Sequence, residues 1–582
     1  MCGVFLGIIS GLVLMTMLVA TVFILLLSRG PIEVPVLRER AAAMLEKQLN
    51  GQAHASIGRT FLARGKHGPS LQIENFVLKD NQERTLVAAP QAEISVATLA
   101  LLTGQLAISG LEFSGLDVKL AVLPDGQMAV SAGQGDAMIL PAPATGTALQ
   151  PADIFAAVFV AASSKAPFLG QMQRIGLTNG KLEVDDRRLQ STIAFSRLNV
   201  SLDRLGPGGI DFSASALSEA GPFSVRLLAR ANIDLMRLVP KLAPEVSDNS
   251  PYVIDFEGKD LPVHELLLAF GQGHQAVDIS MPLSLKGNLG FSNEGKLQAA
   301  QGKFAFGAGF FRVDDPEAAP VQTDEILGSV NFDPQGQRFV LPVIEYFAGL
   351  THIAVEGEIA LSKDNIADHR VHLAGTKLVF AADKPGEKPL NIDSLVLDGA
   401  VPVDLTSATI EKMEVKGAEL TSILAFKGQN TPDGAAISGN IEVSHTTIRA
   451  FLALWPGFLV PDLQTWLTDH VQAGVIDKGR MHFAYDAATI KAMKQKLPIP
   501  DESMVIDMVA SGGTMTPLPG LPPMTGIEGT GHVTGTTASF NINKAEIDTN
   551  NRRLNISDAK FSIPDTRPQK LNPALILSLI HI

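Results

Sequence analysis

The chain has 582 residues with a formal net charge of −13, and charged residues make up only 18% of it. A negative chain repels a phosphate backbone and no cluster of Lys and Arg compensates, so nucleic acid is excluded as a partner. The single cysteine, Cys2, excludes an intrachain disulfide and a zinc site built on cysteines. The length suits either several domains or one repetitive, elongated sheet.

The first 28 residues carry no charge, and the apolar run Val4–Leu27 within them is long enough to cross a bilayer as a helix. The run continues directly into Ser28 and Arg29 without the small-residue site at which signal peptides are cleaved, so we expect an uncleaved membrane anchor over 1–28. Basic residues follow the anchor and none precedes it. The positive-inside rule alone would therefore leave the rest of the chain in the cytoplasm, but long translocated domains can ignore that rule. The residues assigned to the anchor are Val4, Phe5, Leu12, Leu18, Phe23 and Leu27.

After the anchor, residues 29–130 predict one helix followed by β-hairpins. Helix-forming residues at helical spacing fill Val36–Leu49, and the alternating segments that follow indicate strands separated by Gly, Pro and Asp turns. Residues 131–150 are small and nearly uncharged, which predicts a linker or exposed loop. The next stretch, 151–445, opens with a short predicted helix at Ala152–Ser164 and then predicts strands.

The segment Val277–Phe291 shows the pattern on which the fold prediction depends. Every second residue is apolar apart from the glycine at 287, which is typical of a strand with one buried face and one wet face. An unbroken strand of this length would reach roughly 50 Å, so we expect Pro282 or Gly287 to interrupt it. Similar alternation recurs along most of the chain. The apolar positions are Val277, Ile279, Met281, Leu283, Leu285, Leu289 and Phe291.

A helical insert is predicted at 446–474. Asp462 stands where a helix N-cap belongs, and Gly474 stands where a C′ glycine belongs. Strands are expected again from 475 to 576. The last six residues, 577–582, look like a translated sequencing adapter, so we expect a non-native tail on a chain cut near Ile576.

Motifs for catalysis are missing from the sequence, which has no G-x-S-x-G, no Walker A and no H-E-x-x-H. The densest titratable group, 368–372, places His369 and His372 on opposite faces of a strand, so the two cannot share a metal. Trp455 and Trp466 in the insert are better explained by packing than by a ligand site or a membrane-surface contact. We therefore expect neither an enzyme nor a cofactor.

Alternation allows two uses of the apolar strand face. In a β-sandwich the inward side chains meet a second sheet, whereas in an open, curved sheet they are left for another molecule to cover. Aromatic residues are only 6% of the chain, and Leu, Val, Ile and Ala line the strands. Such aliphatic walls suit acyl chains, which need burial and no directional recognition. Under this interpretation the seven apolar positions of Val277–Phe291 line a lipid groove.

Four stretches of the chain resemble the AsmA-like superfamily of bacterial envelope proteins, specifically its YhdP/DUF3971-type branch. They are the anchor exit Leu27–Leu37, the alternating segments of Leu99–Gly126, the insert Leu454–Arg480 with its W-P and W-L pairs, and the proline-rich segment Gly513–Gly529. The insert is the most specific of the four. Together they are spread from one end of the chain to the other.

The resemblance implies a single-pass anchor in the bacterial inner membrane and a periplasmic body. That body would be mainly β: an elongated, curved, antiparallel β-sheet groove, U-shaped in section and carrying a short helical insert, similar to TamB and to chorein-type bridge proteins. The implied function is to bind and conduct phospholipid between inner and outer membrane. The implied partners are phospholipid acyl chains, the inner membrane, and outer-membrane or envelope proteins. The alternative is a structural or assembly factor for outer-membrane protein insertion or envelope integrity, whose strand edges pair with clients.

Overall fold

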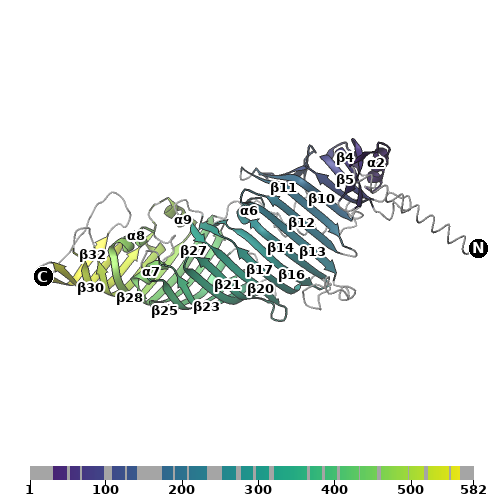
Figure 1. The fold of residues 1–582 in the computed structure, drawn as a ribbon. Coiled ribbons are helices and arrows are strands. Elements are labelled where there is room, and N and C mark those ends of the chain that lie inside the picture. Colours follow the sequence, from purple (N-terminus) through teal and green to yellow (C-terminus); the bar gives the residue numbers. More distant parts are fainter. Residues whose placement is uncertain are drawn as a thin grey trace, which may run out of the picture. The chain divides into compact units, whose positions relative to one another are not determined.

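A computed structural model gives the fold of the chain (Figure 1). Two compact units divide the chain, Met1–Gln298 and Ala299–Ile582, and strands form most of the described part of each, so the protein is mainly β. The structure describes residues 30–48, 53–65, 68–96, 108–124, 128–139, 173–187, 190–205, 209–231, 252–269, 277–292, 297–313, 320–362, 368–382, 387–402, 407–431, 433–454, 461–495, 497, 499–516, 522–549 and 552–563.

The first unit is built from strands that pair mostly with neighbours in sequence. They are β1 (Ile32–Glu33), β2 (Ala53–Ser56), β3 (Thr60–Gly65), β4 (Gly68–Asp80), β5 (Thr85–Val96), β6 (Ile108–Ser114), β7 (Asp117–Val122), β8 (Met128–Ala132), β9 (Met138–Ile139), β10 (Arg174–Asp186), β11 (Ser191–Arg204), β12 (Ile210–Leu217), β13 (Pro222–Ala231), β14 (Tyr252–Pro262), β15 (Val277–Ser280) and β16 (Pro282–Phe291). From β10 to β14 each strand pairs antiparallel with the next, and β16 pairs with β14.

One strand of this unit departs from the expected antiparallel order. β10 runs parallel to both β6 and β7, which pair with successive halves of it. Parallel neighbours need a crossover of a dozen or more residues, and the chain between β7 and β10 is long enough to make one. That crossover includes β9, so the stretch 131–150, predicted to be a loop, contains a short strand that pairs with β8. The predicted helix Ala152–Ser164 lies outside the described residues.

The helix predicted after the anchor is confirmed as α2 (Val36–Gln48). Ala41 and Leu45 on one side of α2 are buried in a cluster with Phe76 of β4 and Ile94 of β5. Phe76 is 1% exposed, as is Leu45, so this helix covers one face of the N-terminal strands.

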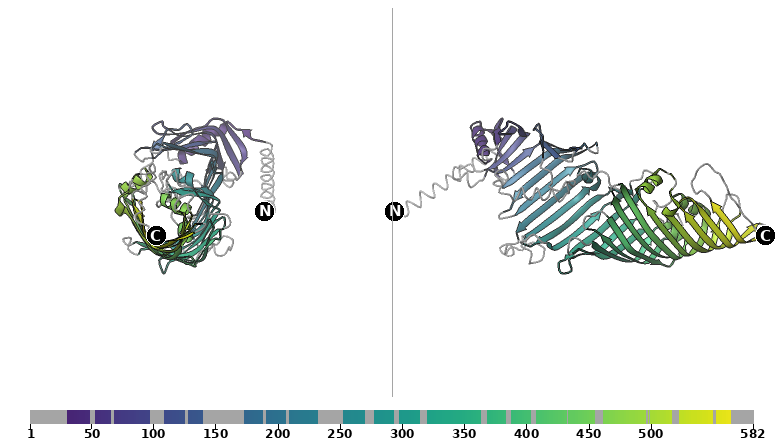
Figure 2. Two further views of the ribbon diagram at one scale, coloured as in Figure 1. Left: turned by 90° about the vertical axis from the view of Figure 1, so that its left-hand side faces the viewer. Right: turned by 180° about the vertical axis from the view of Figure 1, so that it is seen from behind.

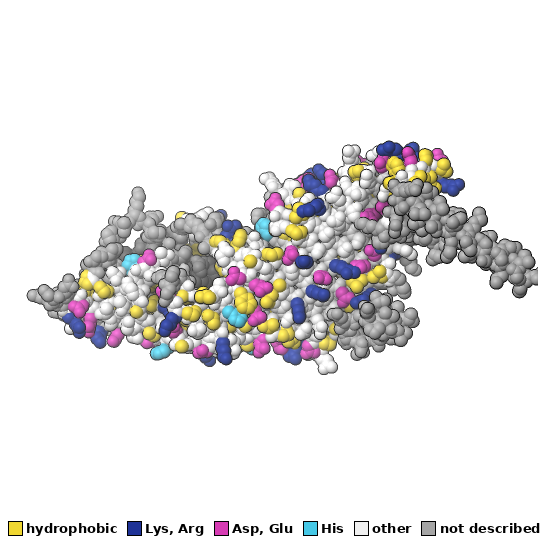
Figure 3. All heavy atoms as spheres, viewed as in Figure 1, with side chains coloured by type: hydrophobic (Ala, Val, Ile, Leu, Met, Phe, Trp, Pro, Cys, Tyr) yellow, Lys and Arg dark blue, Asp and Glu magenta, His cyan; other side chains and the backbone are white. Residues whose placement is uncertain are grey.

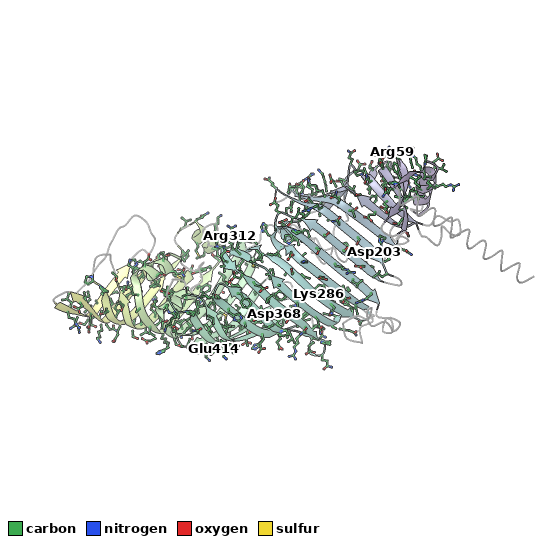
Figure 4. The ribbon with its side chains drawn as sticks, viewed as in Figure 1. Arg59, Asp203, Lys286, Arg312, Asp368 and Glu414 are labelled. Carbon is green, nitrogen blue, oxygen red and sulfur yellow. The ribbon has the colours of Figure 1, made fainter. Side chains whose placement is uncertain are left out.

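The segment Val277–Phe291 forms two strands rather than one. The break falls at Met281, directly before Pro282, while Gly287 lies inside β16. In register, Leu289 of β16 opposes Ile254 of β14, which opposes Ala229 of β13. One row on the opposite face is charged: Lys286, labelled in Figure 4, opposes Glu257, and Glu257 opposes Arg226. Alternation therefore gives these strands one mainly apolar face, while the other face carries charged residues together with the buried Val253.

The second unit is an antiparallel meander. Its strands are β17 (Leu297–Phe306), β18 (Gly309–Val313), β19 (Val321–Thr323), β20 (Glu325–Asp333), β21 (Arg338–Ala348), β22 (Thr351–Ala360), β23 (His369–Phe380), β24 (Leu390–Val401), β25 (Ser407–Gly417), β26 (Leu420–Thr431), β27 (Gly434–Thr447), β28 (Val471–Tyr485), β29 (Met504–Met515), β30 (Met524–Thr534), β31 (Ala538–Thr549) and β32 (Arg552–Ile563). β17 pairs with β20, and from β20 to β32 each strand pairs with the next. The sheet of this unit is curved (Figure 2).

The two faces of the second sheet differ sharply in polarity. Directly opposed residues form rows that run across the strands, and adjacent rows point to opposite faces. One row, from β26 to β30, is apolar: Leu424, Ile441, Met481, Ile506 and Val533. The adjacent row is mostly charged: Ile423, Glu442, Arg480, Asp507 and His532.

The predicted insert is present as two helices, α7 (Ile448–Ala453) and α8 (Pro461–His470). Its predicted ends were wrong. Pro461 occupies the first helical position, which its fixed φ favours, so Asp462 lies inside α8 instead of capping it. Gly474 lies within β28, where a register shift and a φ of 149° mark a bulge that only glycine tolerates well.

Further helical segments interrupt the stretches predicted to be strands. α6 (Val263–Ala269) follows β14, and α9 (Ala487–Lys494) follows β28, with a short 3-10 turn at Asp501–Ser503. Asp486 is the N-cap of α9, since its Oδ1 accepts a hydrogen bond from the Thr489 amide at 2.7 Å. The prediction of continuous strands over 475–576 was therefore wrong at α9.

The predicted anchor, residues 1–28, lies outside the described residues, and so does the predicted tail, 577–582. Among the helices that the structure does describe, none combines the length and the apolar character needed to cross a bilayer.

Candidate functional site

An apolar cavity of about 200 Å³ lies in the second unit, against the apolar face of the strands from β23 to β29. It exceeds the ~150 Å³ at which an apolar cavity in a protein holds a benzene molecule. In a flat sheet, β23 and β29 would lie six strand spacings apart, or about 29 Å. Side chains from both strands line the same cavity, so the curvature of the sheet brings them together. The residues that line it include Met413, Val415, Ser422, Leu424, Ile441, Val443, Phe451, Leu454, Gly479, Arg480, Met481 and Met508.

The floor of the cavity alternates large and small side chains. Across β25 to β29, the directly opposed residues are Val415, Ser422, Val443, Gly479 and Met508. A Cβ atom added to Gly479 would lie 2.7 Å from Cγ2 of Val443, which is closer than carbon atoms pack. The side chain of Val443 therefore occupies the space beside Gly479, which leaves no room for a larger residue at that position.

The roof of the cavity is helix α7. Phe451 and Leu454, at the end of this helix, line the cavity and are half-buried, while Ala450 is fully buried beneath it. Two buried clusters flank the cavity, one containing Phe483 and the other Leu390. Because Phe451 packs against the first and Leu454 against the second, α7 bridges the two clusters.

Polar contacts fix the start of α7. Thr447 is its N-cap and accepts a hydrogen bond from the Ala450 amide at 3.2 Å, and its hydroxyl donates to Oε2 of Glu419 at 3.2 Å. Arg449 pairs with both carboxylate oxygens of Glu419 and donates from Nη1 to the Lys388 carbonyl at 2.6 Å. The hydrogen bond from Arg449 is the main reason that the pKa of Glu419 lies below its ordinary value.

The cavity offers burial and no reactive group. Ser422 is the only uncharged polar side chain among the described residues that line it, and its hydroxyl donates to the Glu442 carbonyl at 3.2 Å. Arg480 also lines it, but its Nε lies 3.1 Å from Oε1 of Glu442, a residue of the charged row. In the described part of the chain, no three His, Cys, Asp or Glu residues gather where they could hold a metal ion.

Tyr485 places a buried hydroxyl at one end of this apolar region. It belongs to the cluster around Phe483, its side chain is 3% exposed, and its hydroxyl has no partner among the described residues. Burial raises its pKa to about 12. Met493 of α9 packs against the same cluster, as does Leu467 of α8, so helices from both ends of the strands cover the sheet here.

The opposite face carries a second, polar hollow of about 380 Å³ over β22 to β25. Glu358, His372, Asp398 and Lys412 oppose one another across these strands, and His372 Nδ1 lies 2.7 Å from Asp398 Oδ1. Glu414, labelled in Figure 4, is flanked by two lysines whose hydrogen bonds lower its pKa to about 2. Figure 3 shows acidic and basic side chains interspersed over this view of the molecule. The charges of this face therefore neutralise one another in pairs.

The lining residues proposed from the sequence lie elsewhere in the fold. Val277 and Ile279 are in β15, Met281 is in the break, and Leu283, Leu285, Leu289 and Phe291 are in β16. None of the seven lines the cavity described above, and their role in a groove stays a prediction.

His369 and His372 have different partners, and Trp466 packs against a residue of its own helix. His369 Nδ1 accepts a hydrogen bond from the Ser362 amide, whereas His372 contacts Asp398, so the two do point to different surroundings. Trp466 stacks on His470 one turn along α8, with ring centroids 5.0 Å apart. Trp455 lies outside the described residues.

The cavity residues were not singled out from the sequence, although a signal for them exists. In Leu420–Phe426 every second residue except Ser422 is apolar, but Ile423 and Ala425 between them are apolar as well, so the alternation is weaker than in Val277–Phe291. In β28, Gly479 interrupts the apolar positions. No protein family, curated protein or solved structure matches this chain.

Proposed function

We propose that this protein is anchored in the bacterial inner membrane and uses the apolar face of its periplasmic β-sheets to bind phospholipid by the acyl chains and conduct it toward the outer membrane. The observation that carries the proposal is the apolar cavity beneath α7. Its walls are mainly aliphatic, methionine and phenylalanine side chains, which bury hydrocarbon without directional contacts, and each buried methylene contributes about 0.8 kcal/mol.

The amphipathic character of the sheets supports the same function. A closed sandwich would cover its apolar face with a second sheet, whereas in the second unit short helices cover the region from β26 to β29. Several apolar residues of that face stay half-buried, among them Met413, Leu424, Ile441 and Met508. A face of this kind can hold an acyl chain at little cost in protein rearrangement.

The test uses the full chain, purified in detergent and mixed with vesicles of phosphatidylcholine that carry a diazirine in one acyl chain. After irradiation, mass spectrometry identifies the cross-linked peptides. We expect peptides from β26 to β29 and from α7, because these elements line the cavity.

Two adjacent residues provide a matched pair of variants. Leu424 faces the cavity, whereas Ile423 lies on the opposite face and is 40% exposed. Leu424→Asp should abolish cross-linking in this region, since an unpaired carboxylate is costly to bury, whereas Ile423→Asp should leave it unchanged. Thermal melts of both variants check that each one folds. Equal labelling of the two variants, or no labelling of the wild type, would refute the proposal and favour a scaffold or assembly factor.

A further inference from the structure

The insert that carries α7 leaves the sheet and returns to it at the same place. Thr446 of β27 opposes Ile476 of β28, and Thr447 opposes Val475. The two strands are thus paired right up to the base of the insert. The sheet does not depend on α7 for its pairing, so α7 can change position without breaking a strand.

The attachment of α7 to the sheet is polar at one end and apolar at the other. At its start, Arg449 reaches across to Glu419 and to the Lys388 carbonyl. The side chains of this ion pair are 33% and 37% exposed. At its end, Phe451 and Leu454 rest on the cavity and are only half-buried.

A helix this short has little stability of its own, because isolated helices need roughly 12–15 residues to be even marginal in water. Its position over the cavity therefore depends on these contacts. Ala450 is the one residue of α7 that is fully buried among those described, and a methyl group contributes little burial. The contacts of Arg449 therefore act together with the cap at Thr447 and the packing of Phe451 and Leu454 to hold α7 in place.

We propose that α7 is a lid on the apolar cavity and that the Arg449–Glu419 pair is the latch that keeps it closed. The inference rests on the proposed function, because the lid would regulate access of an acyl chain to the same cavity. When the latch is broken, Phe451 and Leu454 move away from the cavity, and an acyl chain takes their place against Met413, Leu424 and Ile441. The latch then sets the rate of uptake, while the cavity walls set the affinity.

The test measures both quantities on the full chain in detergent, with cis-parinaric acid as a fluorescent acyl probe. Arg449→Met keeps most of the aliphatic stem and removes the charge and the hydrogen bonds. Loss of a partly exposed ion pair of this kind is expected to speed uptake about fivefold. The exchanged pair Glu419→Arg with Arg449→Glu should restore a rate close to that of the wild type. Arg226→Met, which removes a comparable ion pair with Asp211 in the first unit, is the control and should not change the rate.

The possible outcomes separate the lid from the proposed function. If the wild type does not bind the probe, the proposed function fails. If the wild type binds it but Arg449→Met takes it up at the wild-type rate, only the lid is overturned. Hydrogen exchange tests the lid in the wild type alone: the backbone amides of 450–453 should exchange faster than those of β27 and β28. Equally slow exchange in all three would overturn the lid as well.

Discussion

Replacing Tyr485 with Phe tests whether the end of the apolar region near α9 is dry. The substitution removes only the hydroxyl, which is buried and has no partner among the described residues. An unsatisfied buried hydroxyl costs about 1–3 kcal/mol relative to the unfolded state, where water satisfies it. At pH 7 we therefore expect Tyr485→Phe to raise the free energy of unfolding of the second unit by about 1 kcal/mol or more.

The pH dependence of the same pair gives a second, larger signal. Burial raises the pKa of Tyr485 from 10.0 to about 12, so between these values the folded state keeps a proton that the unfolded state has lost. Stability from this group is complete below pH 10 and falls as the pH rises toward 12. At about 1.36 kcal/mol per pKa unit, the wild type should lose roughly 2–3 kcal/mol relative to Tyr485→Phe over that interval.

The assay is urea unfolding followed by tryptophan fluorescence. The chain has two tryptophans, Trp455 and Trp466, both in the insert of the second unit, so the signal reports that unit alone. Lysines that titrate at high pH affect both proteins equally and cancel in the comparison. A Tyr485→Phe variant that is less stable at pH 7, or a difference that stays constant from pH 10 to 12, would show that the hydroxyl is solvated and that this end of the region is wet.

Three further predictions concern the lid and the bulge. The pKa of Glu419 lies below its ordinary value mainly because of its hydrogen bond from Arg449, so the latch is intact at neutral pH and weakens as the pH falls through the lowered pKa. At acid pH, probe uptake by the wild type should therefore speed up relative to uptake by Glu419→Gln, which shares any effect of the probe's own carboxyl group; a constant ratio between the two would contradict this role of Glu419. Thr447→Ala removes the N-cap of α7, which costs about 1 kcal/mol, and should raise hydrogen exchange in α7 without affecting β28; unchanged exchange would contradict the role of this cap. Gly474→Ala places a side chain on a backbone with a φ of 149° and puts its Cβ 3.2 Å from Gly513 Cα. The substitution should therefore lower the urea midpoint of the second unit by the equivalent of about 1 kcal/mol. Gly428→Ala is the control, since a Cβ there meets nothing within 4 Å, and it should change the midpoint less.

Local pattern was sufficient to predict the strands, their two faces and the position of the insert. Period-two alternation depends only on neighbouring residues, and the same residues decide which face is apolar. The helix at Val36–Gln48 was also predictable, since its helix formers are continuous in sequence. The sequence further identified an insert between β27 and β28, although Pro461 and not Asp462 begins its second helix.

The cavity could not be predicted in the same way. Its floor joins Val415, Ser422, Val443, Gly479 and Met508, which are far apart in sequence and meet only through the register of five strands. Register depends on bulges such as the one at Gly474, and a shift of one residue would turn every side chain to the other face. The helix α9 was missed although Asp486 and Thr489 offer a capping signal, because the apolar strand pattern on both sides of it is stronger.

The meander of the second unit also makes its length adjustable. In the described part of the chain each strand from β20 to β32 pairs with the next, so a hairpin gained or lost alters the reach of the apolar face by two spacings, about 9.6 Å. Neighbouring pairs keep their register when this happens. The insert between β27 and β28 stays with its own pair of strands, whatever the number of hairpins on either side of it.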